Sequence, residues 1–277
     1  MGQQRPMSNL LARVLTALVA GPLVIWLTWL GGWPFTILIL VAAGISLYEF
    51  LGMVERSSPI CLVVAWLLGI GLAWGSTTAW FASHAWLVLV SGVMILLLAH
   101  LMFPGPVQGS ADRAAQSILG VLYAGGLTAC LLHLRALEQG WAWVVLVMMI
   151  TWGSDTAAYF AGRAFGRHKL YPLISPGKTV EGAIGGLAGS MILTLVSWAT
   201  FFPELPLCHG LILALVGGAL GQAGDLVESM LKRSVGVKDS GKLLPGHGGL
   251  LDRIDALIFA APAVLFYATY VIGWAKA

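Results

Sequence analysis

Apolar runs of about 20 residues recur along almost the whole chain, and this feature restricts its fold more than any other. A helix of that length crosses the hydrocarbon core of a lipid bilayer. Hydrophobic residues make up 58% of the 277 positions and charged residues only 10%, which excludes an ordinary soluble domain. The sequence therefore predicts an all-α, polytopic membrane helix bundle. We expect nine spans: Leu10 to Leu30, Pro34 to Met53, Ile60 to Gly75, Ala79 to Phe103, Gln116 to His133, Trp141 to Phe165, Val180 to Phe202, His209 to Leu231 and Leu251 to Trp274.

The basic residues fall mostly on one side of this predicted bundle. If the N-terminus is cytoplasmic, 13 of the 15 Lys and Arg residues lie on the cytoplasmic side, and only Arg135 and Lys276 lie outside. The positive-inside rule therefore predicts a cytoplasmic N-terminus. The 13 residues are Arg5, Arg13, Arg56, Arg113, Arg163, Arg167, Lys169, Lys178, Lys232, Arg233, Lys238, Lys242 and Arg253.

Charged residues are divided unevenly along the chain. The first 150 positions carry only 9 of them, whereas the remaining 127 carry 18. We therefore expect residues 1–140 to form a transmembrane scaffold, and residues 141–277 to form catalytic helices with cytoplasmic loops at 166–179 and 232–250. Glu49 is an exception in the first part, and we favour a structural role for it over a functional one.

The predicted span from His209 ends in acids and a base on one helical face. Asp225, Glu228 and Lys232 share this face because they are spaced by three and four residues. Ionised groups at membrane depth are costly, so they line a wet cavity, bind a cation or pair with one another. A structural ion pair between Glu228 and Lys232 is one alternative, but Asp225 has no such partner in its own helix.

The last predicted span begins with a second acidic pair, Asp252 and Asp255, again on one face. Both acidic pairs lie at the same, cytoplasmic end of their helices. Oxygen ligands from two helices suit Mg²⁺ or Mn²⁺. Either Asp at a helix start can instead cap backbone amides. One cap does not require two acids, so we favour metal binding for Asp252 and leave both alternatives open for Asp255.

The connection between these two spans is polar and rich in glycine. It carries Lys238, Asp239, His247 and Gly248. Backbone amides of such a loop, together with lysine, can hold phosphate groups. A histidine there can donate to a phosphate or transfer a proton, although a solvated loop histidine is the more common case.

A third polar cluster surrounds Asp155 and the start of the span at Val180. Ser175, Lys178 and Thr179 precede this span, and the Gly-Lys-Thr order invites comparison with a P-loop. A P-loop is excluded because its first glycine is missing and no strand precedes it. The remaining alternatives are an anion site at a helix start and a capped helix start without a ligand.

Glycines spaced by four residues mark two of the spans in the second half. Gly182 and Gly186, Gly185 and Gly189, and Gly217 and Gly221 form such pairs. This spacing lets helix backbones approach closely and would hold polar groups at the helix ends rigidly.

The stretch from Ser229 to Asp255 closely resembles the signature of the phosphatidate cytidylyltransferases, the CDP-diacylglycerol synthases. It reads SMLKR, then KD, then PGHGGLLDRID, over 27 residues. The segment from Trp152 to Gly182 is also similar to that family's other polar stretch. The first 150 residues resemble the family only in being apolar and rich in predicted membrane helices.

The resemblance implies a reaction of CTP with phosphatidic acid, giving CDP-diacylglycerol and pyrophosphate. It also implies Mg²⁺ or Mn²⁺ as cofactor, a homodimer, contact with membrane lipid and no nucleic acid partner. The expected location is the inner membrane of a bacterium, with the active site facing the cytoplasm.

The resemblance further implies roles for the site residues. A lipid phosphate oxygen attacks the α-phosphorus of CTP, so catalysis rests on positioning and charge neutralisation. Asp225 and Asp252 are assigned to the metal as catalytic residues, with Asp255 and Glu228 as supporting ligands. The other catalytic candidates are Lys232, Lys238 and His247. The substrate-binding candidates are Asp155, Ser175, Lys178, Thr179, Arg233, Asp239, Gly248 and Arg253.

Two other functions fit parts of the pattern. Another CTP-dependent lipid enzyme, such as a polyprenol kinase, would share the charged helix ends but differ in the loop sequence. An ion-coupled transporter would place its acids near the middle of the membrane, whereas most acids here lie at one helix end.

Overall fold

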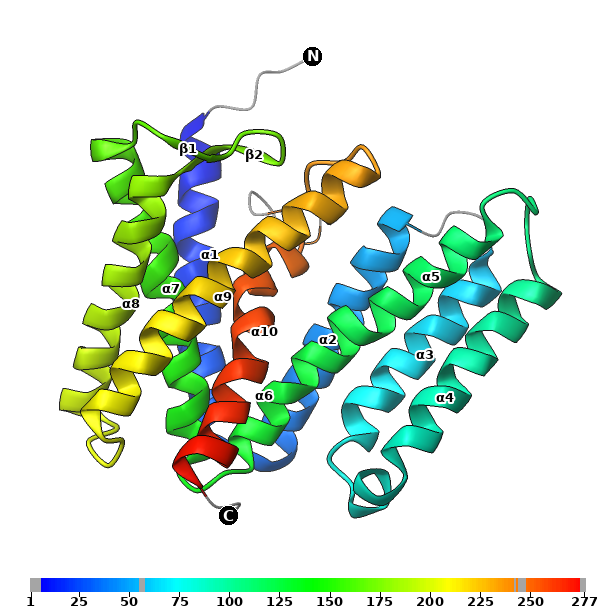
Figure 1. The fold of residues 1–277 in the computed structure, drawn as a ribbon, viewed down its shortest axis with the longest axis horizontal. Coiled ribbons are helices and arrows are strands. Elements are labelled where there is room, and N and C mark those ends of the chain that lie inside the picture. Colours follow the sequence, from blue (N-terminus) through cyan, green and yellow to red (C-terminus); the bar gives the residue numbers. More distant parts are fainter. Residues whose placement is uncertain (1–5, 55–57, 242, 244–247, 275–277) are drawn as a thin grey trace. The chain divides into compact units, whose positions relative to one another are not determined.

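The fold is almost entirely helical in the computed structural model, which describes residues 6–54, 58–241, 243 and 248–274. Side chains are described from residue 18 onward. The elements run in this order, with the α-helices and strands labelled in Figure 1: α1 (Pro6–Leu30), α2 (Gly32–Val54), α3 (Pro59–Gly75), α4 (Ala79–Met102), α5 (Ser110–Gly120), η1 (Val121–Gly126), α6 (Leu127–Arg135), α7 (Gly140–Phe165), β1 (Lys169–Tyr171), β2 (Ser175–Thr179), α8 (Val180–Thr200), α9 (Leu207–Ser234), α10 (Leu251–Phe266) and η2 (Tyr267–Ile272).

Seven helices in the described part of the chain are long and apolar enough to cross a membrane. Two of them contain a π-helical turn: Ser110–Arg135 includes η1, and Leu251–Ile272 includes η2. Two shorter apolar helices, Leu18–Leu30 and Pro59–Gly75, accompany them. An all-α, polytopic membrane protein is therefore confirmed, whereas these lengths do not establish the predicted count of nine spans.

The chain divides into two compact units. Unit 1 consists of Met1–Leu132 and Asp239–Arg253, and unit 2 consists of His133–Lys238 and Ile254–Ala277. The loop before α10 and the first turn of that helix thus pack with the N-terminal helices, although they lie late in the sequence.

Close helix packing in unit 1 depends on small residues. The Trp66 indole of α3 donates to the Gly44 carbonyl of α2 at 2.8 Å, so the two helices approach closely there. A Cβ atom at Gly120 of α5 would lie 2.8 Å from the Phe50 ring of α2, a distance that real Cβ contacts do not reach. Phe50 is fully buried, so glycine is needed at this crossing.

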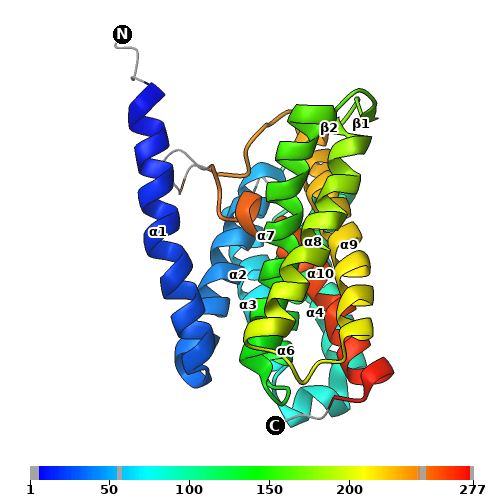
Figure 2. The ribbon, with the colours of Figure 1, turned by 90° about the vertical axis from the view of Figure 1, so that its left-hand side faces the viewer.

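Glycines of α8 let its backbone approach α7 in unit 2. Figure 2 shows α7, α8 and α9 side by side. A Cβ atom at Gly189 would collide with the Gly153 carbonyl of α7, and one at Gly186 would lie 2.6 Å from the Gln222 side chain of α9. Ser190 strengthens the contact by donating to the Ile150 carbonyl of α7 at 2.8 Å. The close approach predicted from the glycine spacing is confirmed for this helix.

A small antiparallel hairpin, formed by β1 and β2, lies in the segment 166–179 that was expected to be a loop. Lys169 pairs with Thr179, and Tyr171 pairs with Ser175. No strand signal is present in the sequence here, because the strands are short and lack an alternation of apolar and polar residues. The hairpin holds the residues just before α8 at one end of α7 and α8, the upper end in Figure 1.

Candidate active site

Lys178 of the hairpin forms an ion pair with Asp225 of α9, both in unit 2. Lys178 Nζ lies 2.6 Å from Asp225 Oδ2, and the side chains are 27% and 34% exposed. Two residues predicted for the site are therefore in direct contact. The sequence showed only that Asp225 has no partner in its own helix, because the lysine comes from a different element.

The hairpin is held at its base by the first turn of α8. Thr179 accepts a hydrogen bond from the Gly182 amide at 3.1 Å and so caps this helix. Glu181 accepts hydrogen bonds from the backbone amides of Arg167 and His168 and contacts the His168 ring at 2.6 Å. The capped helix start, one of the two alternatives left open by the sequence, is therefore present, and it places Lys178 next to the cap.

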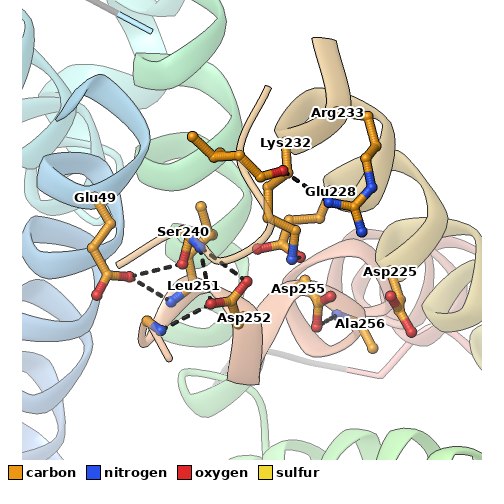
Figure 3. A network of polar contacts seen from close by, with 12 residues as sticks. Glu49, Asp225, Glu228, Lys232, Arg233, Ser240, Leu251, Asp252, Asp255 and Ala256 are labelled. Carbon is orange, nitrogen blue, oxygen red and sulfur yellow. Dashed lines mark hydrogen bonds and ion pairs between the residues drawn. The ribbon is translucent and has the colours of Figure 1, made fainter. Parts of the chain in front are cut away.

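Glu228 and Lys232 form the second ion pair of α9 (Figure 3). The two side chains are one helical turn apart, and both are buried, with 1% and 10% of the side chains exposed. The structural ion pair considered from the sequence is present. Lys232 has a partner that a phosphate would have to replace or share.

Asp255 of α10 lies within electrostatic range of two further acids in unit 2. The charged groups near it are Asp225 of α9, Asp155 of α7 and Lys232 of α9. Asp255 is buried, and its carboxylate accepts a hydrogen bond from the Ala256 amide at 2.7 Å. Three helices thus bring carboxylates together beside a lysine, as expected for a site that binds a cation and phosphates.

Gln222 fixes α9 one turn before Asp225, and the sequence analysis did not single it out. Its amide nitrogen donates to Ser154 Oγ of α7 at 3.1 Å and to the Ala183 carbonyl of α8 at 3.0 Å. The side chain therefore joins three helices next to the acids. An amide within an apolar helix was the available signal, because such a group needs hydrogen-bond partners.

Asp252 belongs to unit 1, where backbone amides orient its carboxylate. The Ser240 amide donates to both oxygens, at 3.2 and 3.0 Å, and the Gly249 amide donates to Oδ2 at 2.8 Å (Figure 3). The second contact satisfies an amide at the helix start, so the capping alternative is realised for Asp252. Capping does not exclude metal binding, because a carboxylate has about four lone-pair positions.

The remaining predicted site residues lie on α7, β2, α9, the loop before α10 and the start of α10. Arg233 donates to the Val237 carbonyl at 2.8 Å, and Gly248 has a left-handed φ of 82° beside Asp252. His247 and Lys242 lie outside the described residues. Lys238, Asp239, Arg253 and Asp155 are exposed, and Ser175 is half-buried.

Among the described residues, no three His, Cys, Asp or Glu side chains form a group that could hold a metal ion by themselves. The donor chemistry nevertheless fits Mg²⁺. This ion prefers oxygen and is usually held by one or two carboxylates together with substrate phosphates, so a group of three is not required. Asp225 is half-buried, which leaves it accessible to a ligand.

The fold and these contacts define a polytopic membrane protein with carboxylates and lysines gathered at the ends of its helices. Buried acids on α9 and α10, with lysines from α9 and the hairpin, are suited to a divalent cation bound with phosphates. The comparisons with known proteins agree with this class.

The sequence matches the cytidylyltransferase family over residues 11–271. It is 33% identical to a phosphatidate cytidylyltransferase of Bacillus subtilis (strain 168) over 266 residues, which cover 94% of this chain and 98% of the relative. It is 39% identical to a phosphatidate cytidylyltransferase of Brucella suis biovar 1 (strain 1330), with 94% of this chain and 93% of the relative covered. The enzyme of the same name from Staphylococcus haemolyticus (strain JCSC1435) is 35% identical, with 90% and 95% covered.

The chain therefore belongs to the cytidylyltransferase family and is a membrane-bound nucleotidyltransferase. The resemblance seen in the stretch from Ser229 to Asp255 is confirmed. The match also includes the N-terminal helices, where the sequence resembled the family in character only.

Proposed function

We propose that this enzyme transfers the cytidylyl group of CTP to phosphatidate, giving CDP-diacylglycerol and pyrophosphate. The names of relatives that align along nearly their whole length support this reaction. Within the structure, the observation that carries the proposal is the ion pair of Lys178 with Asp225 in unit 2, beside the Glu228–Lys232 pair on the same helix. A polyprenol kinase and a transporter are not favoured.

The reaction needs no nucleophile from the protein. A phosphate oxygen of phosphatidate forms a bond to the α-phosphorus of CTP, the bond to the oxygen bridging to the β-phosphorus breaks, and pyrophosphate leaves. The protein therefore has to hold two highly charged substrates in line and neutralise their charge. The side chains assigned to the phosphates are Lys178, Lys232, Arg233, Lys238 and Arg253, and His247 remains a predicted contributor.

A divalent ion, Mg²⁺ or Mn²⁺, would be held by Asp225 and Asp252, with Asp255 and Glu228 as supporting groups. When bound, it neutralises charge on the triphosphate. Asp255 of α10 lies near Asp225 of α9 within unit 2, which supports ligands from these two helices. Backbone amides orient Asp252 as donors around a metal site orient its ligands.

The membrane arrangement is part of the same proposal. The apolar runs predict nine spans, and the distribution of Lys and Arg predicts a cytoplasmic N-terminus and an active site facing the cytoplasm. Within unit 2, Lys178 and Lys232 lie with the acids of α9 and α10, which supports one polar end. The bacterial relatives support placement in an inner membrane, and a homodimer remains a prediction.

The test is an assay of the purified protein with CTP, phosphatidate and Mg²⁺. We expect lipid-linked cytidine and pyrophosphate in equal amounts, and no product after chelation of the divalent ion. Release of CDP with a phosphorylated lipid would instead show a kinase. Absence of any lipid product from a folded, Mg²⁺-supplied sample would contradict the proposed reaction.

A further inference from the structure

Glu49 of α2 carries a buried carboxylate in an otherwise apolar helix. The residue is only 6% exposed. A buried carboxylate is unfavourable unless nearby groups satisfy it with hydrogen bonds. Among the described residues of unit 1, its hydrogen-bond partners are Ser240, Leu250 and Leu251, which lie just before and at the start of α10.

Three donors of that segment reach Glu49. The backbone amides of Leu250 and Leu251 donate to its two oxygens at 3.0 and 2.9 Å, and Ser240 Oγ donates to Oε2 at 3.3 Å. Figure 3 shows the Glu49 carboxylate facing Ser240 and Leu251. The carboxylate thus joins both ends of the loop.

This contact caps α10 from a distant part of the chain. The first amides of a helix have no partner within the helix, and they favour negative charge. Neither Gly249 nor Leu250, at the start of α10, has a side chain that could accept a hydrogen bond. Glu49, 202 residues before Leu251, supplies the acceptor.

Gly241 and Gly249 approach the Glu49 carboxylate closely. A Cβ atom at Gly241 would lie 2.5 Å from Glu49 Oε1, and one at Gly249 would lie 2.5 Å from Oε2. Only backbone without side chains can approach this closely. The two glycines are therefore fitted to a carboxylate at this position.

The same loop residues orient Asp252. The Ser240 and Gly249 amides hold the Asp252 carboxylate, while the Ser240 hydroxyl and the Leu251 amide hold Glu49. Loss of the Glu49 charge would release both ends of the segment that fixes Asp252.

We propose that Glu49 is a positioning residue for the cytidylyl transfer, because it holds Ser240, Leu250 and Leu251 and thereby orients Asp252. The proposal rests on the metal-binding role of Asp252 given under the proposed function. Glu49 itself contacts neither substrate nor metal in this account. Its effect is expected in how the enzyme uses Mg²⁺ and CTP.

The experiment compares Glu49→Gln with the unchanged protein and with Glu204→Gln, a control at an exposed position in the loop after α8. Each purified protein is assayed for kcat, for KM of CTP and for the Mg²⁺ concentration giving half-maximal rate, next to its thermal stability in detergent. We expect Glu49→Gln to lower kcat/KM about 10- to 100-fold with a raised Mg²⁺ requirement, as for groups that orient metal ligands. Glu204→Gln should match the unchanged protein.

A purely structural role predicts a different result. Activity would then fall only with the folded fraction, and the Mg²⁺ and CTP dependences of the remaining enzyme would stay unchanged; this outcome overturns the proposal. If Glu49→Gln fails to fold, the variants Glu49→Asp and Ser240→Ala test the proposal instead. Each weakens the contact between Glu49 and Ser240 but keeps the backbone amides that donate to Asp252. We expect both to raise the Mg²⁺ requirement about threefold, and unchanged requirements in both overturn the proposal.

The two proposals can fail separately. An active Asp252→Asn variant would remove the metal assignment, whatever Glu49 does. An inactive Asp252→Asn variant together with unchanged Mg²⁺ use in Glu49→Gln would remove only the positioning role.

Discussion

The acids of α9 and the acid at the start of α10 are held in different ways. Asp225 and Glu228 are paired with the lysines Lys178 and Lys232. Asp252, in unit 1, is held by the backbone amides of Ser240 and Gly249 instead.

The lysine contacts of α9 can exchange for other partners, whereas the backbone contacts of Asp252 are fixed. A lysine is a flexible point charge that can leave a carboxylate for a phosphate. Backbone amides of a loop anchored at both ends cannot move away without rearranging the loop. We infer that Asp252 is oriented before substrate binds, whereas Asp225 exchanges Lys178 when CTP and its metal ion arrive.

The largest effect is expected for Asp252→Asn. Asparagine keeps one oxygen that can accept from the Ser240 or Gly249 amide, but it removes the negative charge. Because the proposed divalent ion needs the negative charge of Asp252, we expect turnover to fall by about 10²–10³-fold or more while the protein stays folded. Activity assays and thermal unfolding in detergent measure both quantities. Full activity would show that Asp252 serves only to hold the loop.

A large effect on stability is expected for Glu228→Gln, which sharpens the comparison between the two pairs of α9. The variant removes the negative charge from a buried ion pair, and breaking a buried pair by changing one partner costs about 3–5 kcal/mol. The double variant Glu228→Gln/Lys232→Met should recover much of the stability, although not the activity. Equal stability of Glu228→Gln and the unchanged protein in thermal unfolding would disprove this account of the pair.

A smaller effect is expected for Lys178→Gln, whose ion pair is partly exposed. Loss of this pair should change stability by less than about 1 kcal/mol. The KM for CTP should rise about tenfold, because a charge-assisted contact to phosphate is lost. Less Mg²⁺ should be needed at saturating CTP, since Asp225 no longer has to release a lysine.

Lys169→Gln on the same hairpin, where the lysine donates to the Pro176 carbonyl, is the matched control. An unchanged KM in Lys178→Gln would argue against exchange.

Membrane helices and helical faces could be predicted from the sequence because both depend on local patterns. The predicted span from Val180 to Phe202 corresponds to α8, Val180–Thr200, since hydropathy and the helix-start signals agree there. The spacing of Glu228 and Lys232 likewise indicated their pair. The family followed from the loop motif, whose residues keep their order and spacing.

Contacts between distant elements could not be predicted in the same way. The contact of Glu49 with Leu251 spans 202 residues, and no local pattern records it. The partner of Asp225 comes from a hairpin that the sequence did not indicate, because its strands are too short to show a period. Gln222 was overlooked since its role depends on Ser154 and Ala183, which belong to other helices.

The central claim is that acids of α9 and α10 together hold a divalent ion against the phosphates of CTP. Mn²⁺ can replace Mg²⁺ as a paramagnetic probe, and its binding together with CTP can be followed by electron paramagnetic resonance in the unchanged protein, in Asp225→Asn and in Asp252→Asn. We predict a protein-bound Mn²⁺–CTP signal in the unchanged protein that weakens at least about tenfold in affinity in each variant. Unaltered Mn²⁺–CTP binding in either folded variant would contradict the account.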